Sequence, residues 1–252
     1  MNIKKSLFGM LVLVVTAGCN NASPGYKPEE VKLVSSGLIK AGEERRLFPL
    51  ERGNQWVFDI ETTIIRPDGK RETDQKEMTY RCTSVLKQGK RTYYDLESVI
   101  GDDVIEIQRW YFEEGVGYFQ VSVGYPAKPF EPPICAVRLP LEPGNRFDWK
   151  GVGYVPEGIK APSTATTKIL GLQQVDTGLG RMEGYAFETE VKWASGLAKQ
   201  STWWAKDVGI ARYRQEVVAV AKDQKGNPIR IIAISVMRLK SMSLKSTAKG
   251  SE

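Results

Sequence analysis

A repeated sequence motif constrains the fold of this 252-residue chain more than any other feature. The pattern Pro-Leu-Glu-x-Gly-Asn-x-aromatic-x-aromatic begins at Pro49 and returns at Pro140, an offset of 91 residues. Further matches follow in the same order along the chain. The matching segments are 47–58 with 138–149, 94–98 with 185–189, and, shifted by one residue, 111–117 with 203–209. This order predicts two tandem units, 47–137 and 138–240.

Alternating side chains indicate that each unit consists of antiparallel strands. Trp56, Phe58 and Ile60 alternate with more polar neighbours, and the sequence Arg-Pro-Asp-Gly-Lys at 66–70 is typical of a turn. In the second unit, aromatic and apolar residues between 185 and 193 share one face while charged residues share the other. We therefore expect a mainly β protein, a twisted antiparallel half-barrel of roughly nine to eleven strands with at most a short N-terminal helix.

The N-terminus predicts export. Lys4 and Lys5 precede an apolar stretch at 7–15, which is too short to span a bilayer. The sequence Thr-Ala-Gly-Cys that ends at Cys19 resembles the lipobox of bacterial lipoproteins, in which the cysteine is diacylated and the chain is cut before it. We expect a signal peptide at 1–18 and a covalent lipid on Cys19; the alternative is an ordinary secretory peptide cut elsewhere.

Two or three acyl chains would hold the mature protein on a membrane of the cell envelope. An aspartate after the lipidated cysteine tends to retain lipoproteins at the inner membrane; this chain has Asn20, which favours the outer membrane, facing the periplasm, in bacteria with two membranes. Residues 19–46 are expected to form the tether, with a short helix that begins at Pro28. The apolar residues at helical spacing are Val31, Val34 and Leu38. A flexible tail is expected at 241–252.

Composition argues against several activities. The chain has no histidine, the usual general base near neutral pH and the commonest transition-metal ligand. The carboxylate pairs Asp102-Asp103 and Glu113-Glu114 are typical of solvated turns or of opposite strand faces. The charge of +6 falls to +4 when Lys4 and Lys5 are removed with the signal, and it is not clustered as nucleic-acid binding requires. We expect no enzyme, no metal, no nucleic-acid partner and no cofactor besides the lipid.

Two cysteines remain once Cys19 is lipidated. Cys82 and Cys135 form an even remainder in an exported protein, which permits a disulfide. Cysteine is also tolerated in cores as a small hydrophobic residue. The sequence leaves both alternatives open, a bridge or two separate, partly buried thiols.

Aromatic residues are the candidates for contact with a ligand, or for core packing. Trp203 and Trp204 are adjacent on an expected strand, so one should face the core and the other the opposite surface. The candidates are Trp56, Trp149, Tyr185, Trp193, Trp203 and Trp204. Gly53-Asn54 and Gly144-Asn145 are expected to turn the chain sharply into strands that carry aromatics.

The repeated motifs resemble those of a family of bacterial envelope proteins related to the TapB-like and lipoprotein-carrier-like (LolA and LolB type) group. The family pattern matches Phe48, Pro49, Leu50, Gly53 and Trp56, and also Trp203, Trp204, Val208 and Gly209. The resemblance implies a concave sheet that cradles an acyl chain or another apolar ligand in a non-enzymatic, membrane-anchored lipoprotein. The alternatives are an envelope scaffold that binds another protein and, more remotely, a hydrolase that uses carboxylates.

Overall fold

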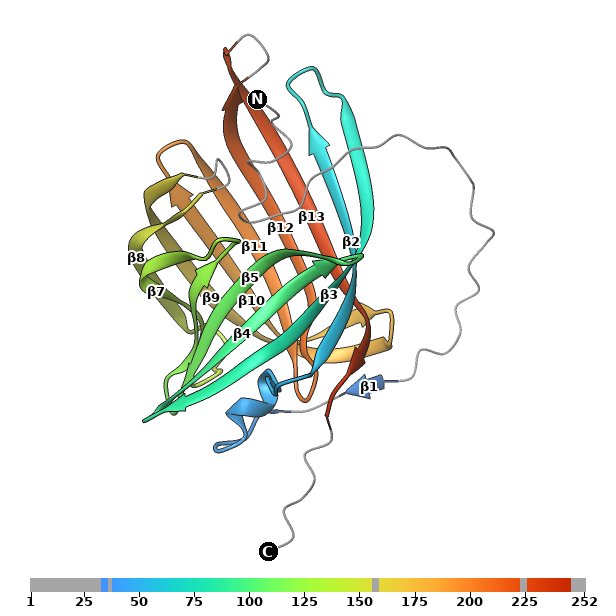
Figure 1. Ribbon diagram of the computed structural model, residues 1–252, viewed down its shortest axis with the longest axis vertical. Helices are drawn as coiled ribbons and strands as arrows, with labels where there is room; N and C mark the ends of the chain where they lie inside the picture. The colour runs from blue at the N-terminus through green and yellow to red at the C-terminus, as the bar shows by residue number, and fades with distance from the viewer. Residues whose placement is uncertain (1–32, 36–37, 156–158, 223–225, 246–252) are drawn as a thin grey trace, which may run out of the picture.

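The computed structural model describes residues 33–35, 38–155, 159–222 and 226–245, which form a β-barrel (Figure 1). A 3-10 helix, η3 (Glu44–Leu47), precedes the barrel. The strands are β1 (Leu33–Ser35), β2 (Gln55–Ile65), β3 (Arg71–Gln88), β4 (Arg91–Ile100), β5 (Asp103–Glu113), β6 (Gly117–Val123), β7 (Lys128–Arg138), β8 (Arg146–Tyr154), β9 (Lys160–Thr177), β10 (Gly180–Trp193), β11 (Gly196–Ala205), β12 (Gly209–Lys222) and β13 (Pro228–Ser243).

The predicted half-barrel of two tandem units is wrong because the sheet closes on itself. Strands β2 to β13 follow one another in antiparallel order, and β13 then pairs with β2. The closing pair runs from Ile232 opposite Ile65 to Ser243 opposite Gln55. The two strands that would be edges of an open sheet therefore bond to each other, and all twelve barrel strands are paired on both sides.

The Gly-Asn turns before β2 and β8 have the same hydrogen-bond pattern. Gly53 and Gly144 have φ of 95° and 90°, which an L side chain rarely adopts. The Gly53 and Gly144 amides donate to the carbonyls of Cys82 and Ile169, and the amides of these two residues donate back to Asn54 and Asn145. Both turns therefore anchor the start of one strand against its neighbour.

The N-terminal segment differs from the predicted helix. Its described part at Leu33–Ser35 is strand β1, which pairs in parallel with the start of β10. Residues 1–32, including Cys19 and Pro28, lie outside the described residues. At the other end, β13 continues into the segment expected to be a tail, because 241–243 pair with β2.

Strands β7 and β8 meet in the least regular pairing of the barrel. Their register contains one pair of residues, Glu131 opposite Val152. Pro129, Pro132 and Pro133 lie in β7 and have no amide hydrogen to donate. Side chains hold this seam, since the Trp149 indole donates to the Pro132 carbonyl at 3.0 Å.

Residues 38–50 close one end of the barrel, the lower end in Figure 1. The Phe48 side chain is 2% exposed and meets four aromatic rings, with centroids 4.9 to 6.4 Å away. These rings belong to Trp56, Trp110, Tyr118 and Trp204. We call Phe48 and these four residues the base cluster. It fills this end of the interior with the protein's own aromatic side chains.

Candidate ligand-binding cavity

A cavity of about 190 Å³ lies inside the barrel beyond the base cluster. The side chains of β10 show how far the cavity extends along the barrel. Tyr185 packs in the core near the base cluster, and Phe187, Thr189 and Val191 line the cavity. Further along the strand, Trp193 packs in a separate buried cluster. That further cluster contains Val155, Trp193, Ala198, Val217, Ala219 and Ala233. Along β10, the cavity therefore lies between these two groups of packed side chains.

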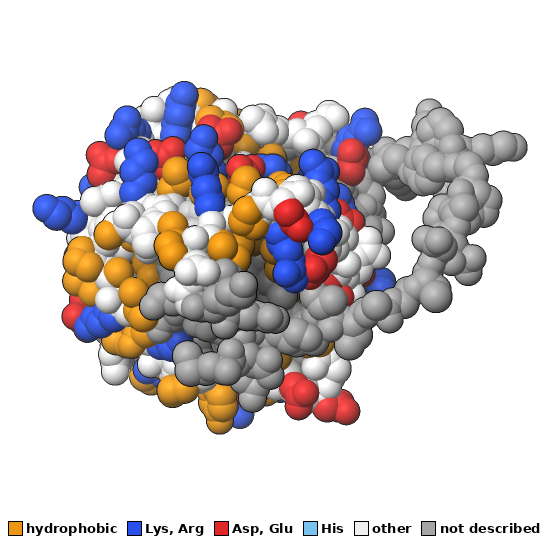
Figure 2. Space-filling model, turned by 90° about the horizontal axis from the view of Figure 1, so that it is seen from above, with side chains coloured by type: hydrophobic (Ala, Val, Ile, Leu, Met, Phe, Trp, Pro, Cys, Tyr) orange, Lys and Arg blue, Asp and Glu red, His pale blue; other side chains and the backbone are white. Residues whose placement is uncertain are grey.

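The end of the barrel seen in Figure 2 carries charged side chains of both signs between hydrophobic ones. The outer wall also carries ion pairs between neighbouring strands. Arg109 pairs with Asp95 at 2.7 Å, and Arg81 pairs with Glu97 at 2.6 Å. The cavity wall combines uncharged polar and apolar side chains with one carboxylate, so it differs in chemistry from the outside of the barrel.

Six polar residues form a belt across six neighbouring strands at the level of the cavity. Each is the register partner of the next, from β2 through β13, β12, β11 and β10 to β9. The polar belt consists of Thr62, Ser235, Gln215, Gln200, Thr189 and Thr167. Four of these side chains form hydrogen bonds in pairs through their hydroxyl oxygens, Thr62 with Ser235 at 3.1 Å and Thr167 with Thr189 at 2.9 Å. Gln215 is fully buried, and neither polar atom of its amide has a hydrogen-bond partner among the described residues.

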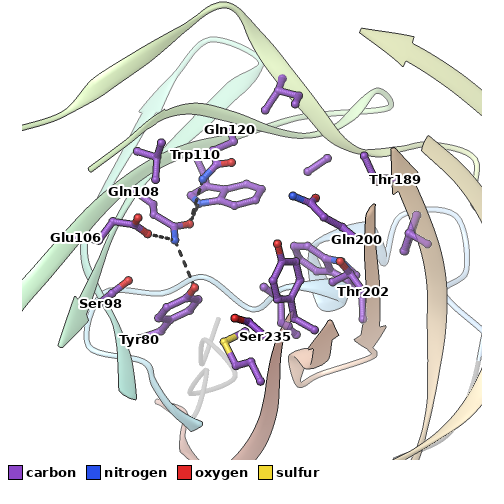
Figure 3. A pocket seen from close by; sticks show the side chains of 18 of the residues that line it. Tyr80, Ser98, Glu106, Gln108, Trp110, Gln120, Thr189, Gln200, Thr202 and Ser235 are labelled. Atoms are coloured by element: carbon purple, nitrogen blue, oxygen red, sulfur yellow. Dashed lines mark hydrogen bonds between the residues drawn. The ribbon is translucent and has the colours of Figure 1, made fainter. Parts of the chain in front are cut away.

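On the opposite wall of the cavity, Gln108 forms hydrogen bonds with four side chains (Figure 3). Its amide nitrogen donates to Glu106 Oε1 at 2.6 Å and to the Tyr80 hydroxyl at 3.3 Å. Its amide oxygen accepts from Trp110 Nε1 at 2.9 Å and from Gln120 Nε2 at 3.2 Å. Four side chains thus fix the orientation of one central amide, and the Glu106 carboxyl is held at the cavity surface.

Glu106 is the one acidic residue among those that line the cavity. Burial raises its pKa to about 7, against smaller opposing effects from the Gln108 hydrogen bond and the charge of Lys128. Burial also raises the pKa of Tyr80 and of Tyr213, which face the same space, so both phenols stay neutral at physiological pH. The cavity therefore holds a single carboxyl group that changes charge near neutral pH.

The structure separates the aromatic candidates. Trp204 lines the cavity and belongs to the base cluster, whereas its neighbour Trp203 lies on the outer wall, 5.6 Å from the Arg212 guanidinium. Trp56 is buried and donates to the Val208 carbonyl at 2.5 Å. Trp149 packs beside Phe130. The Tyr185 hydroxyl accepts from the Ile39 amide at 3.1 Å, and Trp193 packs beyond the cavity.

Both described cysteines are free thiols, which corresponds to the second of the two alternatives. Cys82 is buried on β3, and Cys135 lies on β7 in the cavity wall. Three strands separate β3 from β7 in the sheet order. Burial raises the pKa of each thiol to about 12, so neither is a reactive thiolate at neutral pH.

The adjacent carboxylates singled out in the sequence do not meet the cavity. Asp102 and Asp103 are exposed at the turn between β4 and β5. Glu113 forms an ion pair with Arg91 at 2.8 Å, and Glu114 is exposed. Within the described ranges, no group of three or more Cys, Asp or Glu residues is placed to hold a metal ion.

Sequence reasoning missed Glu106, Gln108 and the polar belt. Glu106, Gln108 and Trp110 alternate along β5, so the shared face of these three residues was visible in the sequence. That alternation does not state whether a polar face points to solvent or to the inside of a barrel. The useful signal was a tryptophan on the same face as a glutamate and a glutamine.

The molecule is thus a closed twelve-stranded antiparallel barrel with an internal cavity of mixed polarity. No family model and no curated relative matches the sequence. Of the part of the chain that is described, no helix is long and apolar enough to cross a membrane.

Solved structures with a similar chain course are described as candidate lipoproteins or a candidate exported protein of bacteria. One is described as a candidate lipoprotein from Parabacteroides distasonis, with 12% identity, a TM-score of 0.44, and coverage of 78% of this chain and 98% of the other. A candidate exported protein with a YmcC-like fold from Bacteroides fragilis has 12% identity, a TM-score of 0.40 and the same coverages. The hypothetical lipoprotein YmcC from Escherichia coli has 10% identity, a TM-score of 0.33, and coverages of 72% and 87%. None of the three is described as a lipoprotein carrier, and at these scores they carry no argument about function.

Proposed function

We propose that the protein is a lipid-anchored envelope protein that binds a small amphiphilic ligand inside its barrel and does not catalyse a reaction. The observation that carries this proposal is the cavity between two packed clusters, with polar groups on an otherwise apolar wall. Ligand sites are typically concave and mostly apolar, with a few polar groups that fix orientation.

The size of the cavity limits the ligand. A volume of 190 Å³ is comparable to that of an engineered apolar cavity of about 150 Å³ that binds benzene. A short amphiphile fits, because its apolar part can contact Ile60, Met78 and Phe187 while its polar group reaches Gln108 or the polar belt.

Binding without catalysis is supported by the side chains of the wall. Hydrolysis by carboxylates needs an acid and a base on two residues, and Glu106 is the one Asp or Glu at the described cavity. A docking role at open sheet edges is also disfavoured, because the barrel strands are paired on both sides.

A cavity-filling substitution tests the binding site. Thr202 lines the cavity on β11, so Thr202→Phe should weaken binding of 1-hexanol at least tenfold by occupying its space. The full chain carrying Cys19→Ser is used for titration calorimetry, so that no acyl chain on Cys19 competes. Ser201→Phe adds the same ring to the outer face of the same strand and should leave the affinity unchanged. Equal affinities in the two variants would contradict the proposal.

The anchor is tested separately by mass spectrometry of the mature protein. We expect an acylated N-terminal peptide that begins at Cys19, and no acylated peptide from Cys19→Ala, because the thiol is the group modified in a lipobox. A mature N-terminus at another residue would identify an ordinary secretory signal and overturn the anchor, without affecting the cavity.

A further inference from the structure

We propose that the ligand of this cavity is a primary amine whose ammonium group pairs with the Glu106 carboxylate. This inference rests on the proposed binding function and names the polar group of the ligand. The geometry behind it is a carboxyl group that faces an internal cavity and forms no ion pair with a described lysine or arginine.

The carboxyl group of Glu106 is only partly satisfied by the protein. Gln108 donates to Oε1 at 2.6 Å and is the only hydrogen-bond partner of this carboxyl among the described residues. No ion pair joins Glu106 to a lysine or arginine of the described chain. The charge of Lys128 on β7 has only a small lowering effect on the pKa of Glu106. Oε2 is left for a donor in the cavity. An ammonium group would supply both the missing hydrogen bond and the opposite charge.

Aromatic rings add to the attraction for a cation. Tyr80, Trp110 and Tyr213 line the cavity together with Glu106, and Figure 3 shows Tyr80 and Trp110 on either side of the Glu106–Gln108 pair. The faces of such rings attract ammonium groups, and they do so more strongly where water is excluded. A carboxylate ligand would instead be repelled by Glu106, and a neutral alcohol would gain a hydrogen bond without the charge.

Three probes of equal length distinguish these cases. Hexylamine, 1-hexanol and hexanoate are titrated at pH 7 into the full chain carrying Cys19→Ser. We expect hexylamine to bind at least tenfold more tightly than 1-hexanol, because a hydrogen bond between charged groups is about twice as strong as a neutral one. Hexanoate should bind most weakly. Equal affinities for the amine and the alcohol would overturn the inference while leaving the proposed function intact, and failure of all three probes would overturn both.

Glu106→Gln provides the matched variant, since glutamine has the same size without the charge. Its affinity for hexylamine should fall at least tenfold, whereas its affinity for 1-hexanol should stay within about threefold. An unchanged affinity for hexylamine would show that the amine binds elsewhere. Glu114→Gln removes an exposed carboxylate on the turn after β5 and should change neither affinity.

Proton release gives a readout that a purely structural role would not produce. An ammonium beside Glu106 favours its ionised form, so binding of hexylamine at pH 7 should release about half a proton per site. The other titratable or charged groups that face Glu106 are Tyr80 on β3, Lys128 on β7 and Tyr213 on β12, and the raised pKa of both phenols keeps them neutral. Calorimetry in phosphate and MOPS buffers, neither of which is a primary amine, measures the release. A release of zero, or an equal release in Glu106→Gln, would contradict the pairing.

Discussion

Replacing Phe48 with alanine is expected to lower the free energy of unfolding by about 3–5 kcal/mol, the range found for truncation of buried aromatic side chains. The Phe48 ring is almost completely buried at the centre of the base cluster. Its ring centroid lies 4.9 Å from that of Trp204 and 5.4 Å from that of Trp56. Removing it leaves a void that these large rings cannot fill without moving.

The surrounding backbone limits any collapse into that void. A Cβ placed on Gly209 would lie 2.6 Å from a Phe48 ring carbon, so the start of β12 is in direct contact with the ring. The segment that carries Phe48 is held from outside as well, because the Arg46 guanidinium binds Asp207 through two hydrogen bonds of 2.5 and 2.7 Å. The Tyr118 hydroxyl also lies within 3.3 Å of the Phe48 carbonyl oxygen.

Urea denaturation followed by tryptophan fluorescence measures the effect. Three of the rings around Phe48 are tryptophans, so acrylamide quenching of the native protein should also increase in Phe48→Ala. Leu38→Ala lies in the same segment but on a side chain that is 65% exposed, and it should change stability by less than about 0.5 kcal/mol. A loss below 1 kcal/mol in Phe48→Ala would show that the ring does not stabilise the closed end.

The strands could be predicted from the sequence, but the closure of the barrel could not. Alternation such as Trp56, Phe58, Ile60 specifies a strand and the face it buries. The pairing of β13 with β2 joins residues such as Met237 and Ile60, which are far apart in the sequence and have no local signature. Alternation is satisfied equally by an open sheet and by a closed one, so the half-barrel was a reasonable but wrong interpretation.

The cavity could not be predicted from the sequence, because several side chains that point into the barrel are polar. Thr189 and Gln200 are polar residues at inward positions, and a strand pattern taken alone places such residues in solvent. A twelve-stranded barrel is wider than an eight-stranded one, whose interior side chains can fill, so an internal cavity can remain. Phe48, by contrast, could be singled out from the sequence because it precedes the repeated Pro-Leu motif. Only the structure shows that it lies in the base cluster.

Raising the pH from 5 to 8 is expected to destabilise the native protein relative to Glu106→Gln by about 2.5 kcal/mol. Burial raises the pKa of Glu106 to about 7 in the folded protein, whereas its ordinary value is 4.5. Between these two values the folded protein retains a proton that the unfolded chain has already released. The unfolded state is therefore favoured as the pH rises. The complete pKa difference corresponds to about 3.4 kcal/mol, of which about 2.5 kcal/mol develops between pH 5 and 8.

The sign of this effect distinguishes a buried carboxyl group from an ordinary ion-paired one. A carboxylate stabilised by a cation has a lowered pKa and would add stability above its unfolded value, so its removal would destabilise the protein at pH 8. Glu106→Gln should instead match the wild type near pH 5, where the folded-state carboxyl is protonated, and exceed it at pH 8. The amide oxygen of the variant can still accept the hydrogen bond from Gln108.

Urea denaturation at pH 5, 6, 7 and 8 measures the difference in unfolding free energy between the two proteins, which removes the contribution of the other titrating groups. Glu114→Gln makes the same chemical change on an exposed residue and should show no such trend with pH. A difference between wild type and Glu106→Gln that stays constant from pH 5 to 8 would mean that water solvates the carboxyl in the folded state. The same result would remove the physical reason for an ammonium group to bind there, because a solvated carboxylate gains little from a single cation.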